Sequence, residues 1–246
     1  MTNSREQQRR AYLDALGIDV FVRRQQPDSA APPAAVEAPA EAALGGTAVE
    51  LANAPAAVSA AGVDFSALRD AVRGCTRCPL HETRTQTVFG VGTVEADWMI
   101  IGEAPGAEED RIGEPFVGRA GKLLDEMLRA VGLSRETVFI ANVLKCRPPG
   151  NRDPGKAEVA ACRSYLEQQI SGIAPRLILV VGRIAAQELL ASDAPVGKLR
   201  GREHDFNGVP LVVTYHPAYL LRSPAQKAKA WEDLKLARRC VRGQAG

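Results

Sequence analysis

MIIGEAPGAEEDRIGEPFVGRAGKLLDEML, residues 99–128, is the stretch that decides the fold. Its apolar beginning is typical of a short buried strand, which ends at a Gly-Glu-Ala-Pro-Gly turn over residues 102–106. Leu124 and Leu128 recur at helical spacing, which predicts a helix from about Gly121. α/β proteins use strand, glycine-rich loop and helix in this order to place a site at the carboxyl end of a sheet.

Three further apolar runs are typical of strands, and helical patterns alternate with them along the chain. The predicted strands span residues 97–101, 138–143, 177–181 and 209–214, and the predicted helices span 121–131, 155–171, 184–190 and 224–239. Strands that alternate with helices of this length imply a parallel sheet covered on both faces. We therefore predict an α/β fold with three layers, α/β/α, around a central, mostly parallel four-stranded sheet.

The 246-residue chain carries a net charge of only +2, so its overall charge does not indicate a nucleic-acid partner. No apolar stretch approaches the length of a membrane span, and the first residues lack the apolar core of a signal peptide. We therefore expect a cytoplasmic protein with no membrane partner. The five cysteines in such a chain favour metal or redox chemistry over disulfides.

The N-terminal quarter of the chain differs in composition from the rest. Residues 1–24 contain an amphipathic segment, which we interpret either as a docking peptide for a protein partner or as a helix packed on the parent domain. Residues 25–62 are rich in Ala and Pro and contain no aromatic residue, a composition typical of a disordered linker. Residues 63–246 form the predicted globular domain.

Distinctive side chains occur where the predicted strands end. Glu103 follows the first strand, Asn142 lies at the end of the second and His216 follows the fourth. Phe116 lies in the loop after the first strand, and an aromatic residue in a loop, where polar residues are usual, suggests a functional role. Because ligands bind beyond the carboxyl ends of the strands in an open α/β sheet, we expect these side chains to converge on one crevice.

Four of the five cysteines have a spacing that suits a metal site. Cys75 and Cys78 form a C-x2-C pair, Cys146 lies in the loop after the second strand and Cys162 lies in a helical pattern. This dispersed pattern suits an iron–sulfur cluster at least as well as zinc, and both alternatives stay open. A third alternative is a buried helical Cys162 with a free Cys146 thiol. A metal here would be structural, because it would lie beside the basic loop and away from the strand ends.

Basic residues gather in two loops. Residues 145–156 include Lys145, Arg147, Arg152 and Lys156 against a single Asp153, and residues 198–202 add Lys198, Arg200 and Arg202. Local basic loops hold phosphates even where the total charge is near zero. We expect backbone phosphate contacts from Arg147, Arg152, Lys198 and Arg200.

Four motifs taken together resemble those of one known family. They are GEAPGAEED at 102–110, GEPFVGRAGKLL at 113–124, ANVLKCRPPGNRDP at 141–154 and HPAYLLR at 216–222. They are similar to the motifs of the family 4 uracil-DNA glycosylases, which carry an iron–sulfur cluster, and the resemblance covers residues 75–239. It implies the uracil-DNA glycosylase fold and a structural [4Fe–4S] cluster held by Cys75, Cys78, Cys146 and Cys162.

The resemblance implies an enzyme that takes uracil out of the DNA stack and hydrolyses its glycosidic bond, leaving an abasic site. It assigns Phe116 to stacking on the base, Asn142 to telling uracil from cytosine and His216 to stabilising the departing uracil at its O2 atom. Gly102 and Ala104 are expected to contact the substrate.

The resemblance leaves the activation of water open. Ala104 stands where a related family has a water-activating Asp. The remaining catalytic candidates are Glu103, as a site organiser or water-positioning residue, and Glu109, as a residue that shapes the pocket. No lysine stands in the motifs as a Schiff-base nucleophile, so we expect a monofunctional enzyme.

Contacts to uracil-containing DNA are expected around the last motif. Leu220 and Leu221 are candidates for an apolar wedge that fills the place of the flipped base, and Arg222, Arg147 and Arg152 for phosphate contacts. We expect a monomer, and the N-terminal arm is a candidate for binding a protein partner. The alternative function is a non-catalytic nucleic-acid-binding module associated with a DNA polymerase.

Overall fold

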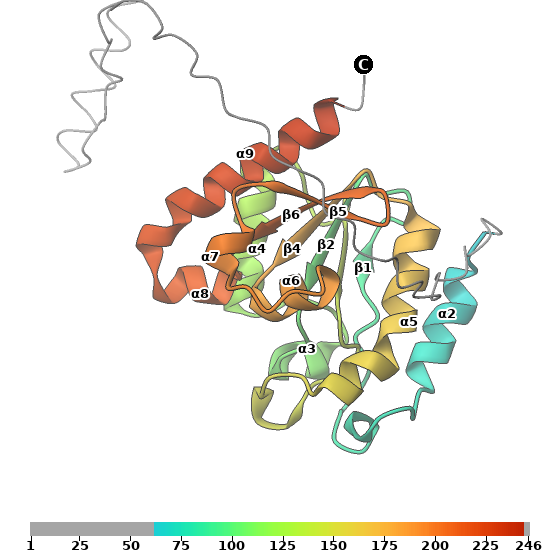
Figure 1. Ribbon diagram of the computed structural model, residues 1–246. Helices are drawn as coiled ribbons and strands as arrows, with labels where there is room; N and C mark the ends of the chain where they lie inside the picture. Colours follow the sequence, from blue (N-terminus) through green and yellow to red (C-terminus); the bar gives the residue numbers. More distant parts are fainter. Residues whose placement is uncertain (1–61, 244–246) are drawn as a thin grey trace, which may run out of the picture. The chain divides into compact units, whose positions relative to one another are not determined.

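The computed structural model describes residues 62–243 (Figure 1). The predicted N-terminal arm, residues 1–24, and all but the last residue of the predicted linker, residues 25–62, lie outside the described residues. None of the described helices combines the length and the apolar character that crossing a membrane requires.

The described chain forms a six-stranded sheet with the order β1-β3-β2-β4-β6-β5. Its four predicted strands run parallel to one another: β2 (Trp98–Gly102), β3 (Phe139–Asn142), β4 (Leu177–Val181) and β6 (Val209–Thr214). Two edge strands, β1 (Val91–Gly92) and β5 (Glu203–Phe206), pair antiparallel with β3 and β6. The predicted count of four strands is therefore wrong. β1 has only two residues and β5 reads EHDF, so neither has the apolar run that marks a strand in the sequence.

Helices cover both faces of the sheet (Figure 1). The helices α4 (Arg119–Ala130) and α9 (Lys227–Gly243) contribute to one apolar core, and α2 (Phe65–Arg73), α5 (Lys156–Ile173) and α6 (Arg183–Leu189) contribute to the other. Neighbouring residues of β2 alternate between the two cores, since Ile100 packs with the first group and Ile101 with the second. The burial of both faces explains why the strands read as continuous apolar runs.

The remaining helical elements are short. They are α3 (Ala107–Ile112), α7 (Val196–Leu199), α8 (Pro217–Arg222) and the 3-10 turns Pro79–His81, Pro149–Asn151 and Pro224–Gln226. The acidic residues Glu108, Glu109 and Asp110, which follow the first motif glycines, belong to α3, a helix that the sequence pattern did not predict. The last helix begins at Lys227 and not at Pro224, which opens a separate 3-10 turn.

The carboxyl ends of β2, β3 and β6 meet at one edge of the sheet. Gly102 at the end of β2 pairs with Asn142 at the end of β3. Thr214 ends β6, two residues before His216. This parallel register brings the three following loops together, and the predicted crevice lies among them.

Candidate active site

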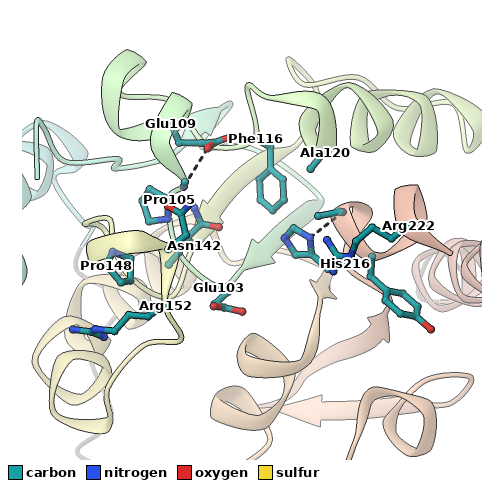
Figure 2. A pocket seen from close by; sticks show the side chains of 15 residues that line it. Glu103, Pro105, Glu109, Phe116, Ala120, Asn142, Pro148, Arg152, His216 and Arg222 are labelled. Carbon is teal, nitrogen blue, oxygen red and sulfur yellow. Dashed lines mark hydrogen bonds between the residues drawn. The ribbon is translucent and has the colours of Figure 1, made fainter.

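The loops after β2, β3 and β6 enclose a pocket of about 510 Å³ (Figure 2). The residues that line it are Glu103, Ala104, Pro105, Gly106, Glu109, Phe116, Ala120, Asn142, Pro148, Asn151, Arg152, His216, Ala218, Tyr219 and Arg222. The predicted convergence of Glu103, Phe116, Asn142 and His216 is therefore what the structure shows. Gly102 lies directly beneath them at the end of β2.

The Asn142 side chain is the most unusual polar group in the pocket. It is only 2% exposed, and its Oδ1 atom is buried without a hydrogen-bond partner. A Cβ atom on Gly102 would lie 2.5 Å from this Oδ1 and 2.5 Å from Cζ of Phe116. Glycine at position 102 therefore lets the amide and the aromatic ring approach each other. A buried polar atom without a protein partner is costly, so a bound ligand or a water molecule has to supply the partner.

The Phe116 ring is held in place by its backbone. Phe116 has a positive φ of 55°, a conformation that a bulky residue rarely adopts. Arg135 donates hydrogen bonds to the carbonyl oxygens of Pro115 (3.1 Å) and Phe116, and its Nε donates to Asp125 Oδ1 at 2.6 Å. The sequence contains no local signal for this role of Arg135. The arrangement keeps the Phe116 ring as a fixed wall of the pocket.

Glu109 organises the loop between β2 and α4 through its carboxylate. One oxygen accepts from the backbone N–H of Gly106 at 3.1 Å, and the other accepts from those of Val117 and Gly118 at 3.0 and 3.3 Å. The side chain lines the pocket, but its oxygens are engaged with backbone groups that lie on both sides of the Phe116 loop. This geometry fits the shaping of the pocket better than acid or base chemistry.

His216 is placed as a neutral hydrogen-bond donor. Its Nδ1 accepts from the backbone N–H of Ala218 at 3.1 Å, at the N-cap of α8. Burial lowers the pKa of His216 to about 4. The positive charge of Arg222 acts in the same direction, and the negative charge of Glu109 acts against it. The imidazole is therefore neutral near pH 7, and because Nδ1 accepts, Nε2 carries the proton.

Glu103 is the other acid of the pocket, and it has a different environment. Burial and the negative charge of Asp153 raise the pKa of the Glu103 carboxyl above its ordinary value, while the charge of Arg183 lowers it. Arg183 Nη2 lies 2.7 Å from Asp153 Oδ2. Within the described chain no side-chain hydrogen bond to Glu103 occupies its carboxylate, which leaves the group available to water.

The four predicted metal ligands surround a second, very small cavity of about 10 Å³. Cys75, Cys78, Cys146 and Cys162 reach it from three segments of the chain, and the other lining residues include Arg84, Lys145 and Tyr165. Arg84 Nη1 lies 3.0 Å from Cys146 Sγ, and the backbone N–H of Lys145 donates to Cys162 Sγ at 3.3 Å. In residues 62–243, no group of three or more His, Cys, Asp or Glu side chains is drawn together as it would be around a single metal ion.

Burial dominates the chemistry of these thiols. It raises the pKa of Cys146 to about 11 and that of Cys162 above its ordinary value. Burial acts in the same direction on Cys75, but hydrogen bonds with Tyr165 and Arg77 outweigh it and lower the pKa. Four thiols converging from three segments fit the donor set of an iron–sulfur cluster. The nearby cations and the Lys145 N–H fit the stabilisation of thiolates.

Comparisons with known proteins identify the family. The sequence pattern of the uracil DNA glycosylase superfamily matches residues 89–235. The type-4 uracil-DNA glycosylase of Pyrobaculum aerophilum is 44% identical over 182 residues, which cover 71% of this chain and 93% of that protein. Those of Archaeoglobus fulgidus and Thermotoga maritima are 43% and 42% identical, over 70% of this chain and 92% and 91% of their own lengths. The chain belongs to the type-4 uracil-DNA glycosylases.

The predicted resemblance to family 4 is thereby confirmed. The pocket residues, from Glu103 to Arg222, all fall within the region that matches the superfamily, whereas Cys75 and Cys78 precede it. Membership of the type-4 family is consistent with an iron–sulfur cluster in the cysteine cavity.

The rim of the pocket differs from the expected DNA-binding surface at one predicted position. Leu220 is 1% exposed and belongs to the core against α4 and α9, so its prediction as a DNA-contacting wedge is wrong. Its neighbours Leu221 and Tyr219 are 37% and 36% exposed. Helical geometry explains the difference, because adjacent residues of α8 point in different directions. Arg222 is exposed and lines the pocket.

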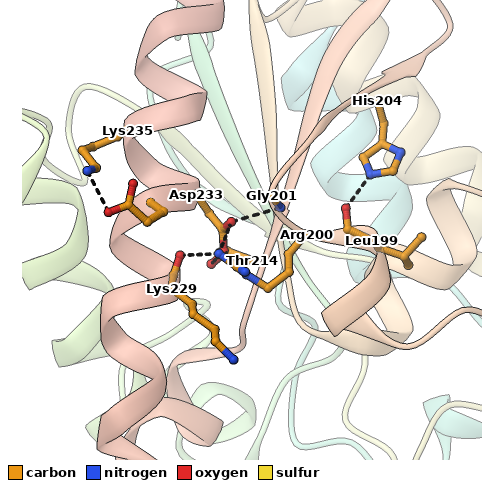
Figure 3. A network of polar contacts seen from close by, with 9 residues as sticks. Leu199, Arg200, Gly201, His204, Thr214, Lys229, Asp233 and Lys235 are labelled. Carbon is orange, nitrogen blue, oxygen red and sulfur yellow. Dashed lines mark hydrogen bonds and ion pairs between the residues drawn. The ribbon is translucent and has the colours of Figure 1, made fainter. Parts of the chain in front are cut away.

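Two of the predicted basic groups are engaged with other groups of the protein: Arg200, which is partly buried, and Lys145, which is buried. Arg200 binds Asp233 through Nε and Nη2, at 2.9 and 2.8 Å, and Asp233 also accepts from Gly201 and Thr214 (Figure 3). Lys145 is 1% exposed, and its Nζ donates to the Asn142 carbonyl and to Gln169 at 2.8 and 2.6 Å. Arg200 is thus engaged by Asp233, so its expected phosphate contact stays a prediction, and Lys145 takes no part in an exposed basic loop.

Arg147 and Arg152 remain on the loop after β3. Arg147 Nε donates to Asn151 Oδ1 at 2.7 Å. Arg152 makes a two-pronged contact with Glu158, at 2.6 and 2.9 Å, and its side chain keeps 48% exposure. Both guanidinium groups thus help to hold the loop that forms one wall of the pocket.

Proposed function

We propose that this protein removes uracil from DNA by hydrolysing the N-glycosidic bond, and that it leaves an abasic site. The observation that carries the proposal is the buried, unpartnered Oδ1 atom of Asn142 inside a pocket at the carboxyl ends of parallel strands. A purely DNA-binding module has no use for such an atom. The alternative of a non-catalytic module is therefore not favoured.

Base recognition follows from the pairing pattern of the Asn142 amide. Uracil presents an N3–H donor to the Oδ1 atom and an O4 acceptor to the Nδ2 group. Cytosine presents the reverse pattern, so its binding would leave buried polar groups unpaired, at about 1–3 kcal/mol each. The Phe116 ring gives the flipped base a face to stack on, and Gly102 and Ala104 keep the floor of the pocket free of bulk.

The bond between C1′ and N1 breaks with both electrons leaving on the uracil ring. We assign stabilisation of this anion to the neutral His216, whose Nε2–H donates to the O2 atom as negative charge develops there. The sugar becomes an oxocarbenium-like cation, and a water oxygen adds to C1′. The carboxylate of Glu103 positions this water and receives its proton. The uracil anion then takes up a proton from solvent.

Glu109 shapes the pocket and does not exchange protons, because backbone N–H groups engage both of its oxygens. The described residues that line the pocket include no lysine, so no amine is placed to form a Schiff base with the abasic sugar. This composition supports a monofunctional enzyme.

DNA binding is assigned to the exposed rim. Arg147, Arg152 and Arg222 contact backbone phosphates, and the exposed Leu221 enters the space that the flipped base leaves. Residues 63–246 are the proposed glycosylase domain, which acts as a monomer. Residues 1–24, joined to it by residues 25–62, are proposed to bind a protein partner.

We assign the cysteine cavity to a [4Fe–4S] cluster held by Cys75, Cys78, Cys146 and Cys162, with zinc as the alternative. When bound to these four thiolates, the cluster would link the start of the domain, the loop after β3 and α5. No step of bond cleavage is assigned to it.

The decisive experiment compares labelled strands that carry one uracil, thymine or cytosine at the same place. After incubation with protein, alkali cleaves any abasic site and the products are sized. We expect cleavage of the uracil strand alone. Asn142→Ala should lower kcat/KM for uracil by about 10²–10⁴, since two buried hydrogen bonds of roughly 1–3 kcal/mol each are lost.

The control variant is Gln168→Ala, which removes an exposed amide on α5 far along the chain from the pocket loops. It should retain the wild-type rate. If Asn142→Ala also retained that rate, the assignment of base reading to Asn142 would be wrong, and equal cleavage of all three strands would refute the proposed specificity.

A further inference from the structure

A second large polar cavity, of about 600 Å³, lies beside the end of α3. Its lining residues come from α2, from the segment between the 3-10 turn Pro79–His81 and β1, and from the end of α3 with the following loop. They are Arg69, Arg73, His81, Arg84, Thr85, Gln86, Thr87, Phe89, Ile112, Gly113 and Glu114. Three arginines and a histidine thus face a single carboxylate, which makes the cavity suitable for an anion.

The arginines are presented to the cavity in distinct ways. The Arg69 guanidinium lies over the Phe89 ring, with Cζ 4.5 Å from the ring centroid, and within the described chain it forms no ion pair with a carboxylate. Arg73 pairs with Asp70, but both side chains are about 70% exposed, which makes the pair weak. Arg84 donates to the Arg73 carbonyl at 3.2 Å and also reaches Cys146. Planar guanidinium groups of this kind suit phosphate oxygens.

One wall of the cavity is fixed to α3. The buried carboxylate of Asp110 accepts from the backbone N–H of Thr85 at 2.9 and 3.1 Å, and Gln86 Nε2 donates to the Arg111 carbonyl at 2.7 Å. Gly113 has a φ of 88°, and a Cβ atom there would lie 2.7 Å from Gln86 Oε1. The segment that carries Arg84 is therefore bound to the same short helix that carries Glu109.

The cavity and the uracil pocket share one loop. Glu114 lines the cavity and Phe116 lines the pocket, so their Cα atoms are at most about 7 Å apart. This distance corresponds to roughly two nucleotide steps of a stacked strand, at about 3.4 Å each. Arg69 and Arg73 line the same cavity as Glu114, so the basic cavity borders the loop that carries Phe116.

We propose that this basic cavity binds backbone phosphates of the uracil-carrying strand, on one side of the flipped nucleotide, through Arg69 and Arg73. The inference rests on the proposed glycosylase function and extends its DNA-binding surface beyond the pocket rim. The same residues could take up a free phosphate anion, and the test separates the two sources.

The test measures binding of a labelled single strand that carries a stable abasic analogue, tetrahydrofuran, in place of the uracil nucleotide. Three strands are compared: one extended on both sides, one truncated on the 5′ side and one truncated on the 3′ side of the analogue. Affinity is followed between about 50 and 200 mM salt, where each lost phosphate contact makes the slope of log K against log salt shallower by about 0.7 for single strands. No catalysis is needed in this measurement.

Arg69→Gln should weaken binding of the full strand about threefold at low salt and flatten the slope by about 0.7, and Arg69→Gln with Arg73→Gln should flatten it by about 1.4. The effect should disappear on one of the two truncated strands and persist on the other. The control is Arg129→Gln, an exposed arginine paired with Glu126 on α4, which belongs to the other face of the sheet. It should leave the slope unchanged.

Equal changes for Arg69→Gln and Arg129→Gln would overturn the proposal, because they would show a general field effect. Persistence of the effect on both truncated strands, or its absence on the full strand, would also overturn it. Inorganic phosphate, added at constant ionic strength, should compete with the full strand more strongly for wild type than for Arg69→Gln. Phosphate binding that depends on Arg69 but leaves DNA binding unchanged would assign the cavity to a free anion and overturn the proposal. If the protein did not release uracil but still bound DNA in a manner that depends on Arg69, the proposed glycosylase function would be wrong. The proposed phosphate-binding site would still stand.

Discussion

The uracil pocket and the cysteine cavity lie four residues apart on the chain, at Asn142 and Cys146, but they are built in opposite ways. The pocket is complete in the polypeptide alone, since Gly102 leaves room for the Asn142 amide and Glu109 binds the surrounding loop. The cysteine cavity holds only about 10 Å³, and burial keeps the pKa of Cys146 at about 11. The Cys146 thiol therefore stays protonated near pH 7, and a metal that binds it must displace this proton. The proposed base removal thus depends on side chains of the polypeptide, whereas the proposed metal would serve to hold the fold together.

His216→Ala should have the largest effect on catalysis and no effect on the cysteine cavity. It removes the proposed donor to the departing uracil, and removal of one such donor lowers kcat by about 10²–10³. Iron content and the visible absorbance of a cluster should be unchanged, because the substitution lies outside the cysteine cavity. Single-turnover uracil release and an iron assay on the same preparation measure both effects. A parallel loss of iron would show that the two regions are not independent.

His216 also predicts a dependence of stability on pH. Its pKa is about 4 in the folded protein against 6.5 for the free side chain, so the unfolded state binds more protons between these values. The free energy of unfolding therefore falls as pH is lowered from about 6.5 to 4, by up to roughly 3 kcal/mol from this group. Urea unfolding of wild type and His216→Ala across this range measures it. A variant with the same pH dependence as wild type would contradict the assignment.

Cys146→Ser should have the opposite effects to His216→Ala, with loss of iron and stability but little loss of activity. It removes one proposed cluster ligand, so we expect loss of iron and a decrease of several kcal/mol in the free energy of unfolding, because metal binding is coupled to folding. At a temperature where the variant is still folded, kcat/KM should fall by less than about tenfold. The control is Cys240→Ser, since Cys240 lies outside the cavity, with its Sγ 3.1 Å from Glu203 Oε2. Iron loss from Cys240→Ser would show that the proposed assignment of the four ligands is wrong.

Gly102→Ala is predicted to damage the pocket by crowding it. The new Cβ would stand 2.5 Å from both Asn142 Oδ1 and Phe116 Cζ, so the amide or the ring must move. Overpacking of this kind costs about 1–3 kcal/mol, and we expect a loss of roughly 10–100-fold in kcat/KM with iron retained. Gly132→Ala is the control for a glycine at an open position, where nothing lies within 4 Å, although its φ of 81° adds some strain. Gly132→Ala should lower stability slightly and leave kcat/KM unchanged.

The central sheet and the pocket were predictable from local signals. Apolar runs marked β2, β3, β4 and β6, and the rule that parallel strands end at one edge placed Glu103, Asn142 and His216 together. The edge strands were not predictable, because β5 gains its place from pairing with β6 and has no pattern of its own.

Contacts between side chains far apart in the sequence were also not predictable. Arg200 binds Asp233, 33 residues away, and Lys145 binds Gln169 on α5, so their charges face inward despite lying in basic stretches. The burial of Leu220 beside the exposed Leu221 depends on where α8 packs. A motif shows which residue types are present, whereas only tertiary packing decides which of them reach DNA.

Tyr165→Phe is the smallest predicted change, and it tests the cysteine cavity without replacing a proposed ligand. The hydroxyl donates to the Ala71 carbonyl at 3.1 Å, and its interaction with Cys75 helps to lower the pKa of that thiol. Cζ of Arg77 lies 3.8 Å from the ring centroid, and Phe would keep that contact. Loss of the hydroxyl should cost about 1 kcal/mol and weaken metal retention about tenfold. The rate of iron loss to a chelator measures this, with Tyr219→Phe at the pocket rim as the control. A fall in kcat/KM at full iron occupancy would show that the cysteine cavity affects catalysis in the uracil pocket. Faster iron loss with unchanged kcat/KM would show that the two regions act independently.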